Sequence, residues 1–546
     1  MSNWTKTVAS RQAGAEREDA LGERGQRPQP AAASRRSFAG VLGRARQPSA
    51  IALAILCAAG AVRVAIALSD HGLYWPDEVF QSLEPAHRMA FGFGFVSWEY
   101  QAGARSWIFP GALGLLMKAA AAAGLSTGLG LVAAAKVAMA ALATLGLWAS
   151  ARLGRALAGW PGALLALLLG AAFPLSLVLG HRALSEMASG PLLAWAAVWT
   201  LEERDRSALR AGAAAALSVA LRPQNVLVLA GLGLLLFLGG RRRSAALFTG
   251  AAVAVAVVAG GLDWITWGEP FQSLIVNLRY NLAEGKTALY GVEPWSFYLT
   301  GLGSAIGPVL VLVIAGLVGV ARRAPVLLGA VVLYLAAHSL ISHKELRFVM
   351  PVVPIALGLA GAGLAVLVER LARPREPAQP RNARGAAATP SRPVRLAPPL
   401  VLGGIAAAAM AFHAARMTFA DVGEWRAPWR DGPVWGAADG VNRLLSQAGA
   451  RPDLCGVLLV NYNPIFTGGY SYLHRNVPLD EIMVEGTAPI HLPDVAGFAN
   501  YVIAPHALGA VEGFTRVAER GDAVLLRRDG ACGPPPPDFS QLFPRS

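Results

Sequence analysis

The sequence predicts an all-α polytopic membrane protein with about 11 transmembrane helices, followed by a small extracytoplasmic α/β domain. Of the 546 residues, 54% are hydrophobic and only 15% are charged, whereas about a quarter of the residues of a typical soluble domain are charged. The apolar residues also gather in runs close to the ~20 residues that a helix needs to cross a bilayer. Three Cys, with Gly and Pro throughout, exclude a disulfide-stapled secreted scaffold and a coiled coil.

The chain starts with a polar segment, residues 1–48, which we expect to be a disordered cytoplasmic tail without a cleavable signal peptide. A transmembrane core is expected over 49–371, and a last transmembrane helix over 398–417. The run 108–150 is too long for one straight helix, so we expect it to break near residues 124–130 and to make one net crossing. The remaining apolar runs cover residues 50–68, 161–180, 183–201, 208–221, 224–240, 244–262, 298–320, 325–341 and 348–371.

Basic residues set the expected orientation, because Lys and Arg collect in cytoplasmic loops. Most of the net charge of +14 lies in the N-terminal tail, in the run Arg241 to Arg243 and in the Arg/Pro-rich linker 372–397. The net charge therefore indicates the orientation of the chain in the membrane rather than binding to nucleic acid. It predicts a cytoplasmic N-terminus and places the loops 70–107 and 263–297 on the outer face.

Residues 418–546 differ in character from the apolar core. They contain a helix-like stretch and three strand-like runs, at 434–449, 456–460, 501–503 and 523–526. These elements predict the small α/β domain on the outer face. Cys455 and Cys532 fall in it, where they could pair in an oxidising compartment or remain two free thiols.

Acidic and aromatic residues are concentrated in the loop 70–107. Asp77 and Glu78 follow Pro76 close to the exit of the first span. A partly desolvated carboxylate at a membrane surface is suited to act as the general base for a sugar hydroxyl. Spacing alone favours another interpretation, in which Asp77 caps the helix that starts at Glu78.

Cationic residues form a second cluster, with His343, Lys344 and Arg347 around Glu345. They could bind a phosphate and stabilise it as a leaving group, or they could contact lipid head groups. Arg222, which precedes a Pro between two short apolar runs, could face a cavity or mark an ordinary tight turn.

Aromatic residues of the segments 277–281 and 290–298 could anchor the protein at the membrane interface or cover a bound sugar or lipid. The sequence contains no Walker loop, HExxH, CxxC pair or dinucleotide fingerprint. A nucleotide-fed reaction is therefore disfavoured, which leaves a lipid-linked substrate or transport.

Taken in order, these clusters resemble the membrane mannosyltransferases of glycosyltransferase family 22, the Alg9-like and GPI-mannosyltransferase group. The first luminal loop of the family is similar to PDEVFQSLEPAH at 76–87, SWEY at 97–100 and RS at 105–106. Its later motifs are similar to RP at 222–223, LYGVEPWSFY at 289–298 and HKELRFVMPVVP at 343–354. Ser97, Tyr100 and Leu346 depart from the usual Thr, Trp and Glu. The resemblance covers residues 70–355 and leaves the tail, the linker and most of the C-terminal region uncovered.

The resemblance implies the GT-C fold and a polyprenyl-phosphate sugar as donor. Asp77 is then the candidate general base and Glu78 the second candidate. The reaction implied is an inverting transfer of a sugar, foremost mannose, to a lipid-linked or cell-surface glycan on the outer face. The residues expected near the donor phosphate are Arg222, His343, Lys344 and Arg347. Those expected to line the acceptor and sugar pocket are Glu84, His87, Trp98, Glu99, Arg105, Tyr290, Trp295 and Glu345.

The lipid-phosphate sugar serves as a co-substrate, and we expect neither a cofactor nor a required metal, although a weakly held divalent cation stays open. The expected partners are this donor, a glycan or glycolipid acceptor and membrane lipids, without nucleic acid. The Ala, Arg and Gly bias is typical of a high-GC bacterial chain, which predicts the inner (cell) membrane. The alternative is a lipid or glycan flippase or another transporter, in which Arg222 and the 343–347 cluster would bind anions.

Overall fold

The computed structural model describes residues 38–372, 396–424, 431–464, 466–484, 497–509 and 511–534. The chain divides into two compact units, residues 1–47 and 48–546, and the second unit holds the elements discussed below. Most of the expected tail 1–48 and linker 372–397 lies outside the described residues. The end of the expected tail is helical rather than disordered, because α1 (Phe38–Ser69) already begins there, in a stretch rich in the helix formers Ala, Leu and Arg.

Five apolar helices are long enough to cross a membrane by length and composition within the described residues. They are Pro48–Ser69 of α1, α6 (Gly128–Ala171), α11 (Arg242–Trp267), Leu346–Leu371, which joins η5 (Leu346–Val352) to α16 (Val353–Leu371), and α17 (Ala397–Ala415). The bent pair α13 (Phe297–Ile306) and α14 (Val309–Val320), with 119° between the helices, would make a sixth span. These helices are those of an integral membrane protein, and the total of about 11 crossings stays a prediction.

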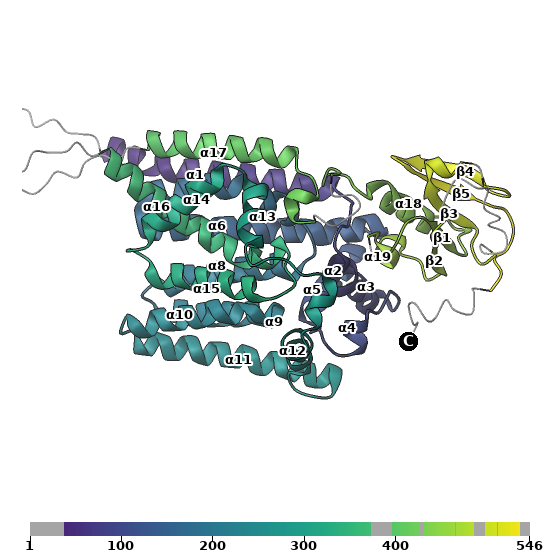
Figure 1. The fold of residues 1–546 in the computed structure, drawn as a ribbon, viewed down its shortest axis with the longest axis horizontal. Coiled ribbons are helices and arrows are strands. Elements are labelled where there is room, and N and C mark those ends of the chain that lie inside the picture. The colour runs from purple at the N-terminus through teal and green to yellow at the C-terminus, as the bar shows by residue number, and fades with distance from the viewer. Residues whose placement is uncertain are drawn as a thin grey trace, which may run out of the picture. The chain divides into compact units, whose positions relative to one another are not determined.

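Shorter helices complete the membrane part. The apolar ones are α5 (Ile108–Ala122), η2 (Pro223–Asn225) with α10 (Val226–Leu238), and α15 (Pro325–Leu340). The others are α7 (Pro174–Leu179), α8 (Ser185–Thr200), α9 (Asp205–Leu221) and α12 (Gln272–Leu278), which is followed by η3 (Arg279–Ala283) and η4 (Lys286–Tyr290). Figure 1 shows the long helices running side by side, with α12 lying across the end of α11.

The expected break in the run 108–150 is confirmed, since α5 ends at Ala122 and α6 begins at Gly128. Helix α6 also bends, because Ala158 and Gly159 have non-helical backbone angles and Pro161 cannot donate a backbone hydrogen bond. Both interruptions fall at Gly-rich or Pro-containing sequence, where a helix is least stable.

Small residues let the membrane helices approach closely. A Cβ atom added to Gly363 of α16 would lie 1.7 Å from the carbonyl oxygen of Gly316 in α14, and one added to Gly361 would lie 2.4 Å from the backbone nitrogen of Ala166 in α6. In lipid, such backbone proximity is a main source of helix association. This explains why the chain can hold 60 Gly in a helical fold.

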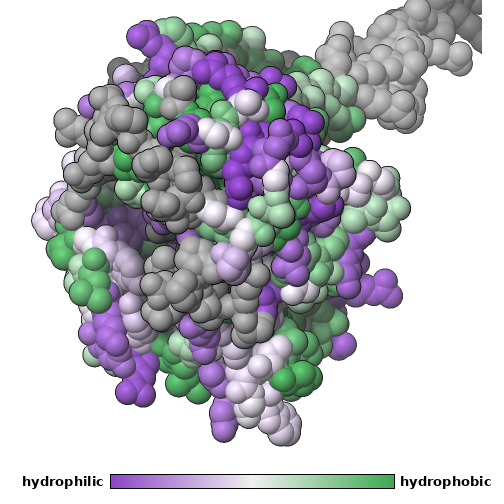
Figure 2. Space-filling model, turned by 90° about the vertical axis from the view of Figure 1, so that its right-hand side faces the viewer, coloured by the Kyte–Doolittle hydropathy of each residue, from purple (hydrophilic) through white to green (hydrophobic). Residues whose placement is uncertain are grey.

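Short helices of the loop 70–107 sit at one end of this bundle. They are α2 (Pro76–Glu78), η1 (Val79–Leu83), α3 (Glu84–Phe91) and α4 (Trp98–Gln101). Hydrophilic residues gather on the face of the molecule that Figure 2 shows, and the surface there is hollowed on one side. The loops 70–107 and 263–297 and the C-terminal domain lie at the same end of the bundle (Figure 1), which we call the polar end.

The C-terminal region folds as the predicted α/β domain. It contains η6 (Ala420–Val422), α18 (Asp439–Gly449), α19 (Gly469–Leu473), η8 (His506–Leu508), β1 (Val457–Val460), β2 (Leu479–Ile482), β3 (Tyr501–Pro505), β4 (Thr515–Arg520) and β5 (Ala523–Arg527). The sheet order is β2-β1-β3-β5-β4, with β1 parallel to β2 and β3, and β5 antiparallel to β3 and β4. The sequence does not predict strands β2 and β4, because both are edge strands that carry charged residues instead of an apolar run.

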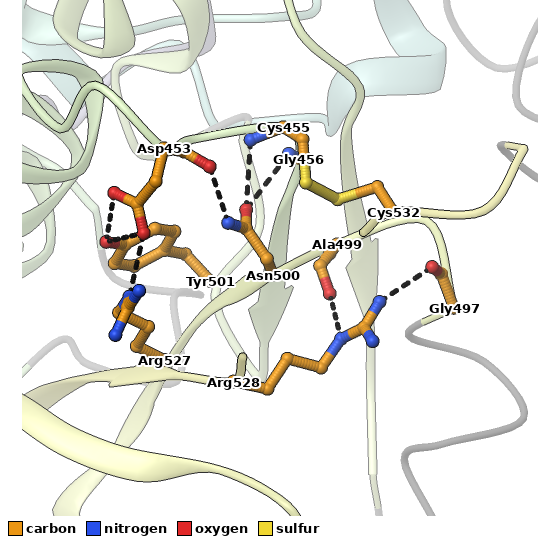
Figure 3. Close-up of a disulfide and its surroundings, with 10 residues drawn as sticks. All are labelled: Asp453, Cys455, Gly456, Gly497, Ala499, Asn500, Tyr501, Arg527, Arg528 and Cys532. Carbon is orange, nitrogen blue, oxygen red and sulfur yellow. Dashed lines mark hydrogen bonds and ion pairs between the residues drawn. A yellow bond between two sulfur atoms is a disulfide. The ribbon is translucent and has the colours of Figure 1, made fainter. Parts of the chain in front are cut away.

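A disulfide joins Cys455 and Cys532, with 6.0 Å between their Cα atoms, so the pairing alternative is confirmed (Figure 3). Beside it, the Asn500 side chain accepts a hydrogen bond from the Cys455 amide at 3.0 Å and donates one to the Asp453 carbonyl at 2.7 Å. Arg528 donates to the backbone carbonyls of residues 497 and 499, both at 2.8 Å. The segment after β5 is thus held against the start of β1.

Candidate active site

Asp77 lies at the polar end of the helix bundle, in the first turn after Pro76. Pro fixes φ and lacks an N–H, which suits the first position of α2. One carboxylate oxygen of Asp77 is 2.7 Å from Nη1 of Arg347, and the other accepts a hydrogen bond from Nε2 of Gln81 at 2.6 Å. The side chain is 24% exposed, so a ligand can reach it.

Glu78 points the other way and is completely buried. Its carboxylate pairs with Nη1 of Arg182 at 3.2 Å and accepts from the Ala183 amide at 3.4 Å. Arg182 also pairs with Asp70 at 2.7 Å. The two adjacent acids therefore differ in role: Glu78 fixes the loop to the segment before α8, and Asp77 faces the open site.

Arg347 is the centre of the acidic cluster. Its Nε and Nη2 donate to both oxygens of Glu345 at 2.7 Å, and its Nη1 lies 3.2 Å from Glu186 as well as 2.7 Å from Asp77. Partial burial raises the pKa of the Glu345 carboxyl, but Arg347 and then His343 outweigh it and hold the pKa down to about 2. One guanidinium thus holds three carboxylates at fixed positions.

Arg222 reaches the same cluster through Glu186, which lies 3.2 Å from its Nη2. Its Nε is buried and has no hydrogen-bond partner among the described residues. The helix α9 ends at Leu221, and Pro223 starts η2, so the chain breaks where the guanidinium enters the site. Arg222 therefore retains a free donor for an anion.

The 343–347 cluster connects two loops. Nε2 of His343 lies 3.1 Å from Glu345, and Nζ of Lys344 donates to the Glu293 carbonyl at 2.7 Å. Lys344 thus ties the cluster to the loop 263–297. Tyr290 of that loop packs near His343, with 5.9 Å between ring centroids.

A cavity of about 400 Å³ lies next to the acidic cluster, and its wall is mostly apolar. Its polar lining residues include Gln81, Arg105, Ser185, Asp263 and Asn277. Its apolar walls come from α5, α9, α10 and α11, with Phe109, Val219, Leu229, Phe248, Val253 and Phe271 among the lining residues. Gln81 both lines this cavity and holds Asp77, so the cavity opens beside the candidate base.

The Alg9-like mannosyltransferase family model matches residues 54–420, two thirds of the chain. The chain belongs to this family. It is 35% identical over 308 residues to GPI mannosyltransferase 3 of Yarrowia lipolytica, covering 55% of this chain and 60% of that protein. It is 28% identical over 340 residues to mannosyltransferase APTG1 of Arabidopsis thaliana, covering 60% of each. The chain thus spans about 60% of the length of these relatives.

Solved structures show the fold. The structure of ArnT from Cupriavidus metallidurans bound to undecaprenyl phosphate superposes with a TM-score of 0.53 and 15% sequence identity, covering 91% of this chain and all of that one. At this identity the likeness establishes the fold alone. It is the GT-C fold, as the family resemblance implies, with a polytopic helical core and a small C-terminal α/β domain.

In this mannosyltransferase-family chain, the structure brings eight of the predicted site residues to one place. A chain of contacts connects Asp77, Trp98, Glu99, Arg222, Tyr290, His343, Glu345 and Arg347. Arg105 lines the adjoining cavity, Lys344 points to the backbone of the loop 263–297, and Trp295 is largely exposed on that loop.

Glu84 and His87 lie elsewhere than expected. Both are buried against the C-terminal domain: Glu84 accepts from the Phe95 and Ser471 amides at 3.1 and 2.6 Å, and His87 Nε2 lies 2.8 Å from Nδ1 of His474. Burial raises the pKa of Glu84 to about 7. These side chains fix the loop 70–107 to α19, because their polar atoms find partners there rather than in the pocket.

Sequence reasoning missed Glu186, Arg182 and Glu424, which lie outside the motifs. It also passed over Gln81, although Gln81 belongs to the motif at 76–87. Glu424 accepts a hydrogen bond from Nε1 of Trp75 at 2.9 Å. Burial and then the negative charge of Glu345 raise the pKa of Glu424 to about 7. Within the described residues, no group of three or more His, Cys, Asp or Glu side chains is arranged to hold a metal ion.

Proposed function

We propose that this protein is an inverting α-mannosyltransferase that takes mannose from a polyprenyl phosphate and transfers it to a glycan or glycolipid. The observation that carries the proposal is the setting of Asp77, an accessible carboxylate with both oxygens oriented by Arg347 and Gln81. Family membership and the names of the mannosyltransferase relatives support the sugar.

In the proposed step, Asp77 accepts the proton of the acceptor hydroxyl as its oxygen attacks the anomeric carbon of β-linked mannosyl phosphate. The new C–O bond forms as the bond from the anomeric carbon to the phosphate oxygen breaks. The electron pair of that bond leaves with the polyprenyl phosphate, and the product is an α-mannoside. Glu78 cannot serve as this base, because its buried carboxylate is paired with Arg182.

Arg222 is assigned to the leaving phosphate, since its buried Nε has no partner among the described residues and its Nη2 pairs with Glu186, which also contacts Arg347. Arg347 is already surrounded by Asp77, Glu186 and Glu345, so we assign it to orienting the base. His343 lies at the rim of the same cluster, paired with Glu345. Positive groups that are fixed before the reaction stabilise developing phosphate charge without reorganisation.

The apolar cavity beside Gln81 suits a lipid chain. Its volume of about 400 Å³ and its lining from α5, α9, α10 and α11 match a long aliphatic substrate with a polar head at the acidic cluster. The basic segments that we expect in the cytoplasm support a reaction on the outer face of the membrane. The disulfide is in keeping with an oxidising compartment for the C-terminal domain.

The test uses membranes that contain the full-length protein and radiolabelled polyprenyl-phosphate mannose. We expect label in one lipid or glycan fraction, its loss in Asp77→Asn by a factor of at least about 10³, and retained binding of the donor. Asp205→Asn is the matched control, because Asp205 is an exposed residue in a surface salt bridge with Arg243.

Unchanged product formation in Asp77→Asn would refute the base assignment. Label from a different sugar, but not from mannose, would correct the donor. Movement of the labelled lipid across the membrane without any new glycosidic product would instead favour the flippase alternative.

A further inference from the structure

Three aromatic side chains border Asp77 without a role in the proposed chemistry. Trp98 comes from α4, Tyr280 from the π-helical turn η3, and Tyr290 from η4. Trp98 is 42% exposed and Tyr290 is 56% exposed, so both present open ring surface. Aromatic residues from two separate loops, 70–107 and 263–297, therefore meet at one place.

Tyr280 fixes the other two rings. Its ring lies 4.7 Å from that of Trp98, between centroids, with 35° between the planes. Its hydroxyl is hydrogen-bonded to the Tyr290 hydroxyl at 3.0 Å, and the Lys286 ammonium lies 5.3 Å from its ring centroid. The exposed rings are thus held in place before any ligand binds, which lowers the entropic cost of binding.

These rings are close to the candidate base. Glu99, the neighbour of Trp98, accepts a hydrogen bond from Gln81 at 2.9 Å, and the same Gln81 amide donates to Asp77. Burial and the hydrogen bond to Tyr280, followed by the charges of Glu99 and Asp77, raise the pKa of Tyr290. Tyr290 also packs beside the same cluster, because its ring centroid lies 5.9 Å from that of His343, which pairs with Glu345.

Rigid aromatic faces beside acidic acceptors match the two surfaces of a sugar ring. The C–H face of a pyranose is apolar and stacks on a ring, whereas its hydroxyls donate to carboxylates. An interfacial anchor needs neither the hydrogen bond between Tyr280 and Tyr290 nor the nearby carboxylates. Trp264, which is 64% exposed on α11, is the kind of residue that fits such an anchor.

We infer that Trp98 and Tyr290, held by Tyr280, form the subsite that binds the accepting sugar as a hexopyranoside. The inference rests on the proposed function, because it assigns the acceptor side of the same site. In this subsite the sugar stacks on Trp98, Glu99 accepts from one of its hydroxyls, and a second hydroxyl reaches Asp77. Tyr280 is a positioning residue, since it acts through the two rings that it holds.

The experiment measures binding of methyl α-D-mannopyranoside to the full-length protein in lipid nanodiscs, by saturation-transfer NMR. We expect the dissociation constant to rise about three- to tenfold in Trp98→Ala and in Tyr280→Ala. Tyr280→Phe keeps the ring contact with Trp98 and loses only the hydrogen bond to Tyr290, so the dissociation constant should rise less. Trp98→Phe retains a ring and recovers part of the binding.

Two controls make the result specific. Trp264→Ala should leave binding unchanged, and mannitol, which has the hydroxyls without a rigid ring, should bind far more weakly than the mannoside. Equal binding of the mannoside to the wild type, Trp98→Ala and Tyr280→Ala would overturn the subsite, as would mannitol that binds as well as the mannoside.

The transfer assay separates this inference from the proposed function. Unaltered labelling kinetics in Trp98→Ala, with active wild type, would refute the subsite alone. A wild type that transfers no mannose but still binds the mannoside through Trp98 would refute the proposed function and leave the sugar subsite standing.

Discussion

Arg347 contacts Asp77 through the same Nη1 atom that contacts Glu186, at 2.7 and 3.2 Å. Residues 270 positions apart in the sequence thus share one hydrogen-bonding arrangement. Because the other guanidinium nitrogens are bound to Glu345, Arg347 has little freedom to move. The position of the candidate base is therefore set by the 343–347 segment as well as by its own loop.

Arg347→Lys is expected to reduce mannosyl transfer by about two orders of magnitude while the protein still folds, because an ammonium cannot replace a planar guanidinium that binds three carboxylates. Initial rates with labelled donor measure the loss. Arg243→Lys, at an exposed pair with Asp205, is the control and should behave as wild type. Near-normal rates in Arg347→Lys would show that Asp77 does not depend on this contact.

Arg182→Ala should impair folding rather than chemistry alone. The substitution leaves Asp70 and Glu78 buried without their shared cation, and breaking a buried pair costs about 3–5 kcal/mol. We expect a large loss of monodisperse protein on size exclusion and a lower melting temperature. Combining it with Glu78→Gln should restore part of the yield, and no restoration would argue against this explanation.

Glu84 makes stability depend on pH. Burial raises its pKa in the folded protein to about 7 from its ordinary value of 4.5, so the folded state binds the proton more tightly than the unfolded state. Its contribution to stability is full below about pH 4.5 and is lost as the pH rises through 7. Melting temperatures of wild type and Glu84→Gln should therefore diverge across this window, with the steeper decline in the wild type; parallel curves would contradict the assignment.

Removal of the disulfide should destabilise the C-terminal domain. Cys455 and Cys532 are separated by 77 residues, and closing a loop of that size is worth on the order of 3–5 kcal/mol. Cys455→Ser and Cys532→Ser should lower the thermal unfolding temperature of the full-length protein and increase proteolysis within 431–534. Cys57→Ser is the matched control, because Cys57 is a free thiol on α1. Equal stability of all three variants would contradict the prediction.

Chelation of divalent metals should not reduce transfer. In the proposed step, arginine and histidine side chains rather than a metal ion neutralise the charge of the phosphate. Initial rates in EDTA should equal those with added Mg²⁺ or Mn²⁺. A loss in EDTA that is restored by one of these ions would reveal a weakly bound cation as a participant.

The sequence by itself determined the membrane core, the break between α5 and α6 and the small C-terminal α/β domain, because apolar runs and Gly or Pro interruptions act over neighbouring residues. It also brought Asp77, Arg222 and the 343–347 segment forward as candidates. The resemblance to the mannosyltransferase family supported the same positions and is confirmed by the family model.

Only the tertiary structure decided which of two adjacent acids faces the site. Asp77 and Glu78 are adjacent acidic residues that the sequence does not distinguish. Their roles differ because Arg182, more than 100 positions away, forms a buried pair with Glu78. The family resemblance likewise predicts Glu84 and His87 in the pocket, whereas the structure gives them Ser471 of α19 and the adjoining His474 as partners. Partners from distant segments, and the burial they create, set the role of each ionisable side chain, and no local pattern records them.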